Sequence, residues 1–525
     1  RTRLDNIKVM FFVGINDGNV PKKADSRSVL SESDREYLED NGIVMSASVR
    51  EKAFTQRFYL YLIMTKSAEK LYMSYAVKNS EGAALMPSYI IRSMRKMFPQ
   101  CLKLSYKDTA QQNSYVTIPH AAYSFDNTEI AANVDEDIID SLTGGRLVGS
   151  VTSFENFAEC PLRYYLRYGV DLKEREEFTF SPVNFGVVLH AVIREVCDEI
   201  KKNGESYYLI SEEKRREMVK RSVSAITDIY QNSILKDSSR NSFMIKRMED
   251  LADRTIWAMG EQLKCGDFVP FVFEHKFNME VGDGDRKQLM SGTIDRVDIC
   301  ENDTDVYVRI IDYKTGKKDF NIVKTYYGID IQLMVYMEAA MKLVAKMRPG
   351  KNVLPAGVFY YNISDPIVSA TNESAEEIED KIKGELRLKG MVNSDKDIAE
   401  KMDNTEGTSL NIPVSRKADG GFDSRRSKVM NTEQFNMLGR FVDVRAIDTA
   451  DRIAGGDIRR SPYKDGQFSS CDRCPYGAVC GFSVDLPGCN YRKLKKFDDE
   501  VLWNNIKEGV DENGKKMDTG AEERD

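Results

Sequence analysis

The stretch Gly292–Lys314, GTIDRVDICENDTDVYVRIIDYK, predicts a β-hairpin around which the rest of the chain is organised. Two runs rich in Ile and Val, Thr293–Ile299 and Val306–Tyr313, are typical of strands. The segment Glu301–Asp305 between them is rich in turn-forming residues. The two runs should therefore pair as neighbouring antiparallel strands.

Each predicted strand carries one carboxylate in an apolar setting, Asp295 in the first and Asp312 near the end of the second. Because side chains alternate across a strand, Lys314 should share a face with Asp312, about 7 Å along the backbone, with room for a metal and a water between them. Two converging carboxylates repel each other, and a divalent cation relieves that cost. An ammonium group can orient a metal-bound water or stabilise the charge that develops on a phosphate. The pattern suits phosphodiester hydrolysis, although Asp-x-Lys alone is more often a solvated ion pair.

The order of motifs around the hairpin resembles the RecB-type branch of the PD-(D/E)XK nucleases. Asp295 is followed by IDYKTG at Ile311–Gly316 and then by QLMVY at Gln332–Tyr336. Gln332 and Tyr336 stand four residues apart and so share a helix face. The resemblance places this face beside the catalytic centre.

In the same family, a histidine from an upstream helix joins the two aspartates at the metal. His190 in FGVVLHAVI matches this position, and Gly186 completes the G-x-x-x-H pattern. A lone His on a helix with an apolar face is more often a packed or capping residue, but the match to the family pattern favours the metal. Glu274 in the strand-like segment FVFEHKF is a weaker candidate for supporting the site.

The mechanism that this resemblance implies is Mg²⁺-dependent hydrolysis of DNA. The metal ligands would be His190, Asp295 and Asp312. Lys314 would position the attacking water. The remaining pair, Gln332 and Tyr336, would orient the DNA or the lysine.

The cysteines suggest a metal centre rather than disulfides. Nine cysteines without a secretory signal indicate a reducing compartment, which we expect to be the cytoplasm. Three of them form a C-x2-C-x5-C pattern at Cys471, Cys474 and Cys480. A fourth ligand must come from elsewhere, with Cys160 and Cys489 as candidates. Four thiolates suit either zinc or a [4Fe–4S] cluster, and spacing alone leaves both open.

A lone cysteine in CPLRYY followed by a distant triplet resembles the iron–sulfur nucleases of the AddB and Cas4 families. This resemblance implies that Cys160 joins Cys471, Cys474 and Cys480 around a [4Fe–4S] cluster. The cluster would clasp together the two ends of the nuclease domain.

The first part of the chain is predicted to be a separate α/β domain. Residues 7–14, IKVMFFVG, form an apolar run typical of a buried strand, and Phe54–Tyr75 predicts a helix followed by a strand. This part resembles the end of the second motor domain of superfamily 1 helicases. Thr65-Lys66 stands where those motors have Thr-Arg, and a lysine lacks the planar fork that reaches ATP phosphates. We therefore do not expect this segment to use ATP.

Composition and linkers predict the domain organisation of the 525 residues. The expected parts are 1–130, a helicase-like α/β part; 131–147, a polar connection; 148–490, an α/β nuclease domain with a mixed central sheet and flanking helices; and 491–525, a polar tail. A helix should start near Ser150, with Thr152 or Ser153 as its N-cap. The chain starts at Arg1 rather than Met, which suggests a piece of a longer polypeptide.

Charge composition does not decide the partner. The net charge of −7 gives no overall attraction to nucleic acid, so DNA contacts would come from local basic segments such as Arg492–Lys496. Arg163 and Arg167, at i and i+4, predict a basic ridge that could meet phosphate. We find no apolar run long enough to span a membrane.

Nearly the whole chain resembles the C-terminal half of the AddB (RexB) family, the second subunit of bacterial helicase–nucleases that process double-strand breaks for recombinational repair. The resemblance implies an exonuclease that digests the 5′-terminated strand of unwound DNA beside an AddA-like partner, which supplies the ATP motor. The competing hypothesis is a scaffold that binds DNA ends without cutting them, with an iron–sulfur or zinc clasp.

Overall fold

The computed structural model describes the chain in segments: residues 7–22, 31–43, 48–78, 84–101, 133–135, 148–173, 182–229, 239–281, 288–369, 373–484 and 489–522. They belong to two compact units, Arg1–Phe125 and Asp126–Asp525. Of the expected connection 131–147, residues 131, 132 and 136–147 lie outside the described residues. Asn133 forms a β-bridge with Asp457, which attaches this short piece to the second unit.

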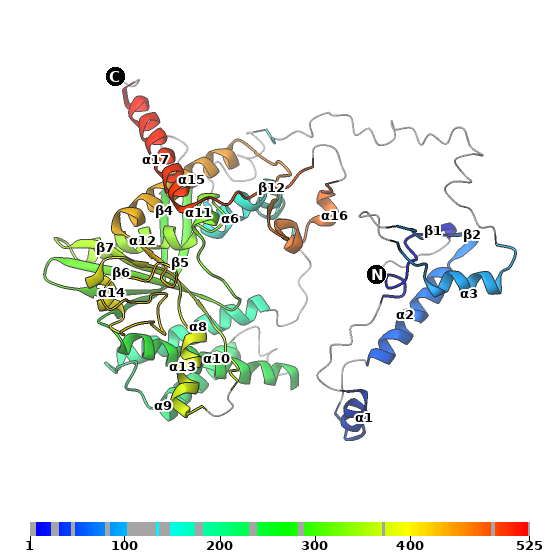
Figure 1. Cartoon of the computed structure of the whole chain (residues 1–525), viewed down its shortest axis with the longest axis horizontal. Coiled ribbons are helices and arrows are strands. Elements are labelled where there is room, and N and C mark those ends of the chain that lie inside the picture. Colours follow the sequence, from blue (N-terminus) through cyan, green and yellow to red (C-terminus); the bar gives the residue numbers. More distant parts are fainter. Residues whose placement is uncertain are drawn as a thin grey trace. The chain divides into compact units, whose positions relative to one another are not determined.

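The first unit contains a parallel pair of strands, β1 (Ile7–Phe12) and β2 (Ser67–Met73), with α2 (Val49–Met64) between them in sequence (Figure 1). Its other described helices are α1 (Glu32–Asp40) and α3 (Tyr89–Met97). The predicted strand exists, but the prediction that it is buried is wrong, since Phe11 is 70% exposed. In the described part of this unit, β1 pairs only with β2, so much of the apolar surface of β1 stays exposed.

The second unit is built on a seven-stranded mixed sheet with the strand order β3-β5-β6-β7-β8-β9 and β4 paired to β5. The predicted hairpin is confirmed as β5 and β6, which pair antiparallel from Arg296↔Ile311 to Glu301↔Val306. β7 then lies parallel to β6, which requires a crossover connection. The strands are β3 (Val148–Ser150), β4 (Val269–Val281), β5 (Gln288–Glu301), β6 (Asp305–Lys314), β7 (Asn352–Asn362), β8 (Lys389–Asn393) and β9 (Val429–Met430).

Helices cover both faces of this sheet, which confirms the predicted α/β class (Figure 1). One core lies between the sheet and the first helical layer, α8 (Pro182–Lys202), α9 (Glu212–Ile229), α10 (Ser239–Lys264), α13 (Ala375–Glu385) and α14 (Lys396–Met402). The other core lies beneath α6 (Val151–Glu159), α12 (Gln332–Met347), α15 (Thr432–Ala454) and α17 (Asp499–Glu522).

Alternation along β6 divides its side chains between these two cores. Ile311 and Tyr313 are buried in the first core, whereas Val308 and Ile310 are buried in the second. Asp312 therefore points to the side of the sheet that α12 covers. This strand end carries the candidate site.

The N-cap of helix α6 lies two to three residues earlier than predicted. Its N-cap is Ser150, whose hydroxyl accepts a hydrogen bond from the backbone N–H of Ser153 at 3.1 Å. The prediction of Thr152 or Ser153 as the cap is wrong because Ser150 ends β3 and still has extended backbone angles, as an N-cap requires. The hydroxyl of Ser153 instead donates to the carbonyl of Ser150.

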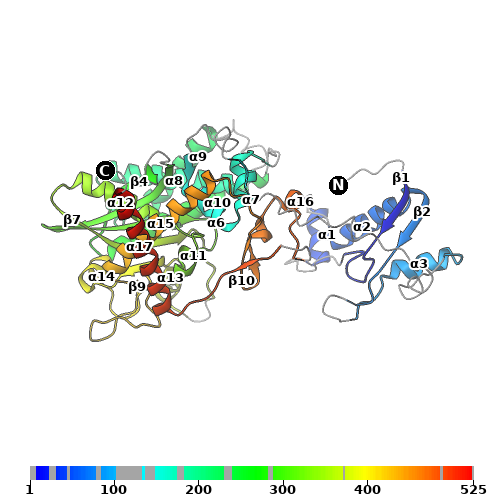
Figure 2. The same ribbon diagram turned by 90° about the horizontal axis from the view of Figure 1, so that it is seen from above.

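The segment expected to be a polar tail contains helix α17 instead. Leu502 and Ile506 lie four residues apart on one face of α17 and are 3% and 0% exposed in the second core. Figure 2 shows α17 alongside α15. The segment is polar on average, so its composition does not reveal the apolar face. A few apolar residues on one side of a helix are enough to pack it against the core. Among the described helices, we find none with the length and apolar character needed to cross a membrane.

Candidate active site

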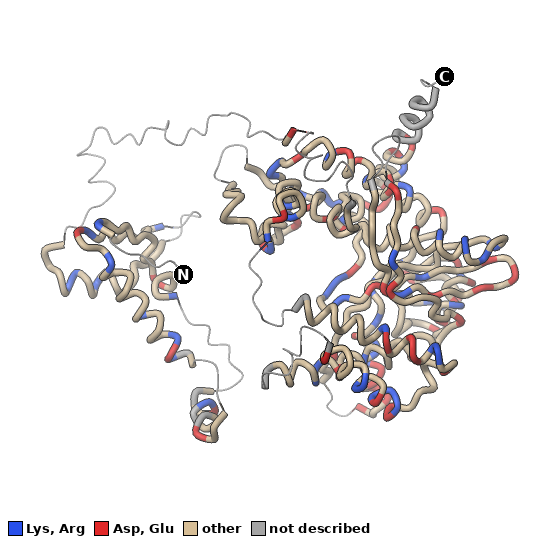
Figure 3. Tube along the Cα trace, turned by 180° about the vertical axis from the view of Figure 1, so that it is seen from behind, with Lys and Arg blue, Asp and Glu red and all other residues tan. Residues whose placement is uncertain are grey.

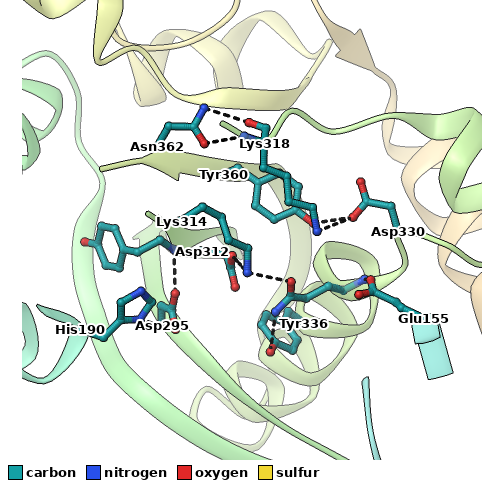
Figure 4. Close-up of polar contacts among 12 residues, drawn as sticks. Glu155, His190, Asp295, Asp312, Lys314, Lys318, Asp330, Tyr336, Tyr360 and Asn362 are labelled. Carbon is teal, nitrogen blue, oxygen red and sulfur yellow. Dashed lines mark hydrogen bonds and ion pairs between the residues drawn. The ribbon is translucent and has the colours of Figure 1, made fainter. Parts of the chain in front are cut away.

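The candidate site lies at the end of β6, where five elements converge (Figure 4). The side chains come from α8, β4, β5, β6 and the start of α12. They are His190, Glu274, Asp295, Asp312, Lys314, Gln332 and Tyr336. The structure thus brings together all of the residues that the sequence predicted for the nuclease site, and it includes the weaker candidate Glu274.

One group of three side chains could hold a metal ion. Nδ1 of His190 lies 3.5 Å from Oδ1 of Asp295 and 3.6 Å from Oε1 of Glu274. The three ligand atoms lie within 4.8 Å of one another. The second carboxylate oxygen of Asp295 accepts a hydrogen bond of 2.7 Å from the backbone N–H of Tyr313, which fixes the orientation of the carboxylate.

The charge on His190 shows how strongly this group attracts a cation. Burial lowers the pKa of His190, but hydrogen bonds to Asp295 and Glu274 outweigh burial and raise the pKa to about 10. A protonated imidazole therefore balances the two carboxylates when no metal is bound. A bound divalent cation could neutralise the two carboxylates instead. His190 would then be a neutral imidazole, which is the form that binds a metal.

Glu274 reaches the site through an unusual backbone conformation. Phe273 pairs with Arg296 and His275 with Ile294, so Glu274 lies opposite Asp295. Its φ angle is 48°, in the left-handed region that a Glu within a strand rarely adopts. Such strain costs about 1–3 kcal/mol and tends to occur at functional sites. Glu274 lies opposite Asp295 because of the register in which β4 pairs with β5. The sequence does not specify that register.

Asp312 and Lys314 share a face of β6, as alternation predicts, but they touch directly. Nζ of Lys314 lies 2.6 Å from Oδ2 of Asp312, which leaves no room for a water or a metal between these two atoms. Burial raises the pKa of Asp312 to about 6, and the charge of Asp295 adds to the effect while Lys314 opposes it. Oδ2 forms this ion pair without a hydrogen bond, so the buried oxygen is not fully satisfied.

The first residues of α12 hold the ammonium group of Lys314. Oε1 of Gln332 accepts a hydrogen bond of 3.0 Å from Nζ of Lys314, and Nε2 of Gln332 donates to the hydroxyl of Tyr336 at 2.9 Å. Gln332 and Tyr336 thus share a helix face, as their spacing predicts. The ring of Tyr336 packs edge-on against Phe277.

A second polar network lies beside the lysine, and sequence reasoning missed it. Nζ of Lys318 lies 3.0 Å from Oδ1 of Asp330 and 4.5 Å from the ring centroid of Tyr360. The hydroxyl of Tyr360 donates to the same oxygen of Asp330 at 2.6 Å. Asn362 fixes the backbone of Lys318 through hydrogen bonds of 2.9 and 3.0 Å. No motif in the sequence marks these residues, since the contacts join separate elements.

Glu155 of α6 also borders this network. Its Oε1 accepts hydrogen bonds from the backbone N–H groups of Ile331 and Gln332. Burial raises the pKa of Glu155 to about 7, although Lys318 opposes this effect. Glu155 thus connects α6 with the start of α12.

The donor set fits a divalent cation that prefers oxygen ligands. Glu274 and Asp295 offer carboxylate oxygen atoms and His190 offers one nitrogen. Asp312, predicted as the third ligand, is not part of this compact group, and its carboxylate pairs with Lys314 instead. Mg²⁺ is typically bound through carboxylates together with waters and substrate phosphates. The incompletely satisfied oxygen of Asp312 is consistent with this fit.

Four cysteines form a second candidate metal centre. Cys160 lies between α6 and α7 (Pro161–Tyr164), and Cys480 ends α16 (Gly477–Cys480). Together with Cys471 and Cys474 they line one small cavity, which Leu162, Leu166, Pro462 and Phe482 also line. Cys489 is buried but does not line this cavity.

The spacing of the four sulfur atoms bears on the choice of metal. Across the described residues, the one set of three or more His, Cys, Asp or Glu ligand atoms within 4.8 Å of one another is the His190 group, so the four thiols are spread more widely. Around a single zinc ion, with Zn–S bonds of about 2.3 Å, tetrahedral sulfur atoms would be about 3.8 Å apart.

The thiols lie in an environment that disfavours a free thiolate. Burial raises the pKa of Cys160, Cys471 and Cys480. A metal would be needed to hold them deprotonated.

The predicted basic ridge beside the cysteines is largely occupied. Arg163 forms an ion pair with Glu159, and Arg167 lies over the ring of Tyr168 at 5.4 Å. Arg163 is therefore held by a partner in the protein rather than displayed for phosphate.

The fold and site define the class of the protein. A profile of the PD-(D/E)XK nuclease superfamily matches residues 149–481, and the chain belongs to this superfamily. Over its whole length it is also similar to proteins that are named as one subunit of an ATP-dependent helicase/deoxyribonuclease. It is 32% identical to the one from Lachnoclostridium phytofermentans, covering 100% of this chain and 49% of that protein.

Two further relatives carry the same name. The protein from Clostridium acetobutylicum is 30% identical over 98% of this chain and 49% of its own length. The protein from Caldanaerobacter subterraneus subsp. tengcongensis is 30% identical over 100% of this chain and 50% of its own length. The chain thus spans about half the length of these curated relatives, and the predicted resemblance to the AddB family is confirmed.

Proposed function

We propose that this chain is the Mg²⁺-dependent exonuclease part of a helicase–nuclease that processes DNA ends at double-strand breaks and digests the 5′-terminated strand. The observation that carries the proposal is the contact of Lys314 with both Asp312 and Gln332, directly beside the group formed by His190, Glu274 and Asp295. The names of the relatives support the helicase–nuclease context. The strand polarity rests on the family resemblance.

In the proposed mechanism, His190, Glu274, Asp295 and Asp312 would hold Mg²⁺. When bound, the ion supplies positive charge for the scissile phosphate and lowers the pKa of a coordinated water. The chain's own residues place the remaining groups. Gln332 holds the ammonium of Lys314 beside Asp312, where it can donate to the attacking water or to a phosphate oxygen.

Cleavage of single-stranded DNA labelled at the 5′ or the 3′ end tests this function. We expect Mg²⁺-dependent degradation that EDTA abolishes and that Asp312→Asn reduces by about 10²–10⁴-fold, because several kcal/mol of charge stabilisation is lost. Asp305→Asn is the matched control, since Asp305 is a partly exposed carboxylate at the other end of the same strand.

The labels also report polarity, and the controls identify the alternative. Release of label from the 5′ end would support digestion of the 5′-terminated strand. Equal cleavage by wild type and Asp312→Asn would refute the site. DNA binding without cleavage, both alone and with a helicase partner, would favour the non-cleaving scaffold.

We further propose that Cys160, Cys471, Cys474 and Cys480 hold a [4Fe–4S] cluster. The shared cavity supports a metal centre at these four cysteines, and the choice of a cluster over a single zinc ion rests on the family resemblance. Anaerobically purified wild type and Cys489→Ser should contain about four iron and four sulfide per chain, whereas Cys160→Ser should lose most of both. Colourless wild type with stoichiometric zinc would refute the cluster.

The proposed partners are DNA and an AddA-like subunit that supplies the ATP motor. The relatives' names describe one subunit of a helicase/deoxyribonuclease, which supports a second subunit as partner. Acidic and basic residues are interspersed along the described chain (Figure 3), so DNA would be attracted by local groups near the site rather than by net charge.

A further inference from the structure

Helix α12 begins without a cap of its own. Its N-cap residue is Ile331, whose apolar side chain makes no capping hydrogen bond. The N–H groups of Ile331 and Gln332 are both accepted by Oε1 of Glu155 at 3.0 Å, across 176 and 177 residues of sequence. A carboxylate from another helix therefore takes the place of the missing cap, where it also meets the positive end of the helix dipole.

The helix end that Glu155 fixes carries the side chain that holds the catalytic lysine. Gln332 is the first residue of α12, and its Oε1 accepts the hydrogen bond from Nζ of Lys314. Its amide nitrogen donates to Tyr336, so the Gln332 side chain has little freedom to follow the lysine if the helix end moves. The location of the lysine's ammonium thus depends on the first turn of α12.

Glu155 is itself well placed to fix that turn. It lies on α6, which is anchored by the N-cap at Ser150 and by the buried residues Val151 and Phe154 in the second core. Burial raises the pKa of Glu155 to about 7, against the opposing charges of Lys318 and Lys314, and Oε1 can accept both hydrogen bonds in either protonation state. Glu159, one turn further along the same helix, pairs with Arg163 instead, so it offers a matched control on α6.

We propose that Glu155 is a positioning residue for phosphodiester hydrolysis, which caps α12 and thereby holds Gln332 and the ammonium of Lys314 in register with Asp312. This proposal rests on the nuclease function proposed above. Glu155 acts through α12 rather than as a ligand of the metal. The contact joins α6 to the active site by two hydrogen bonds to a single oxygen.

Steady-state cleavage kinetics of Glu155→Ala, Glu155→Gln and the control Glu159→Gln test the proposal. We expect kcat of Glu155→Ala to fall by about 10²-fold, as for a reacting group displaced by about 1 Å. KM and the Mg²⁺ concentration for half-maximal rate should stay within about twofold, because neither DNA binding nor metal binding is removed. Glu155→Gln keeps an oxygen acceptor and should recover most of kcat, and Glu159→Gln should resemble wild type.

A double-mutant cycle separates positioning from a general loss of stability. If Glu155 acts through Gln332, adding Glu155→Ala to Gln332→Ala should lower kcat little further, because both changes release the same lysine. Hydrogen exchange provides a readout that does not depend on activity. The amides of Ile331 and Gln332 should exchange faster in Glu155→Ala, while amides in the middle of α12 keep their protection.

The outcomes distinguish this proposal from the function on which it rests. Wild type that fails to cleave DNA would overturn the proposed function and the positioning role together. Wild type that cleaves, with kcat unchanged in Glu155→Ala, would overturn the positioning role alone. Independent losses in the double mutant, or unchanged exchange at Ile331 and Gln332, would overturn it as well.

Discussion

At the scale of single residues, Glu274 stands out because its backbone is strained to bring its carboxylate to the site. The left-handed φ of 48° has no advantage for strand pairing, but it directs the side chain toward His190 and Asp295. Two carboxylates around one imidazole make a stronger cation site than Asp295 alone. Metal binding at this group, as proposed above, would give the strain a function.

We expect Glu274→Gln to weaken Mg²⁺ binding while leaving the fold intact. Removal of one charged oxygen from the ligand group should lower the apparent Mg²⁺ affinity by at least about tenfold. The rise in melting temperature on adding Mg²⁺ measures this affinity without requiring cleavage. Glu280→Gln on the same strand is the control, and an equal loss in both variants would contradict a metal role for Glu274.

At the scale of elements, α12 and α15 meet through a pair of acids. Burial raises the pKa of Asp443 to about 8, and the neighbouring Glu338 adds to this rise, while Lys342 opposes it. Two half-buried carboxyl groups that are hydrogen-bonded to each other share a proton, because ionising both would place two negative charges side by side. The packing of these helices thus carries a titratable group that the sequence does not reveal.

Stability should depend on pH through Asp443. Its pKa in the folded state lies above the value of about 3.9 for an unfolded chain, so the folded protein holds a proton that the unfolded chain releases. The free energy of unfolding should therefore fall as pH rises from about 4 to about 8.

Asp443→Asn should remove this contribution, and so raise the melting temperature at pH 8 relative to wild type but change it little at pH 4. Thermal melts at both values measure the difference. Asp448→Asn, at a more exposed position on the same helix, is the control. A gain of equal size at both pH values would count against the shared proton.

Helix α17 supplies a second prediction at this scale. Ile506 is fully buried and packs in the core beneath α15, so Ile506→Ala should lower the free energy of unfolding by about 2–5 kcal/mol. Val501, on the same helix, is 46% exposed, and Val501→Ala should cost less than about 0.5 kcal/mol. Urea unfolding measures both, and similar small losses would show that α17 is not an integral part of the core.

At the scale of the whole nuclease unit, the cysteine centre joins the two ends of the matched sequence. Cys160 lies near the start of the segment 149–481 and Cys480 near its end. A metal centre that closes so long a loop restricts the unfolded chain and stabilises the folded one. The same helix, α6, carries Glu155 toward the active site and ends directly before Cys160.

Loss of the cysteine centre should therefore destabilise the whole unit. Cys160→Ser should melt at a lower temperature than wild type under anaerobic conditions, and unfolding should expose the sheet and helices together. Cys489→Ala, which removes a buried thiol that does not line the cavity, should lower the melting temperature much less than Cys160→Ser. Equal melting temperatures for wild type and Cys160→Ser would argue against a stabilising centre.

Much of the fold and most of the candidate site could be predicted from the sequence, because their signals are local. Two runs rich in Ile and Val around a turn-forming segment predicted the hairpin of β5 and β6. The fixed spacing of Gln332 and Tyr336 placed both on one helix face, and the structure joins them by a hydrogen bond. The order of motifs typical of the superfamily then led to the hypothesis that His190, Asp295 and Asp312 bind one metal.

The sequence by itself determined the class of fold, since strand and helix patterns are properties of short segments. It also indicated the candidate catalytic side chains, through the order of motifs along the chain and the family resemblance that this order carries. Only the tertiary structure decided that Glu274 faces His190, that Glu155 caps α12, and that α17 belongs to the core. It also decided that Phe11 is exposed. These features depend on strand register and on helix packing between segments far apart in sequence, and no local pattern specifies such contacts.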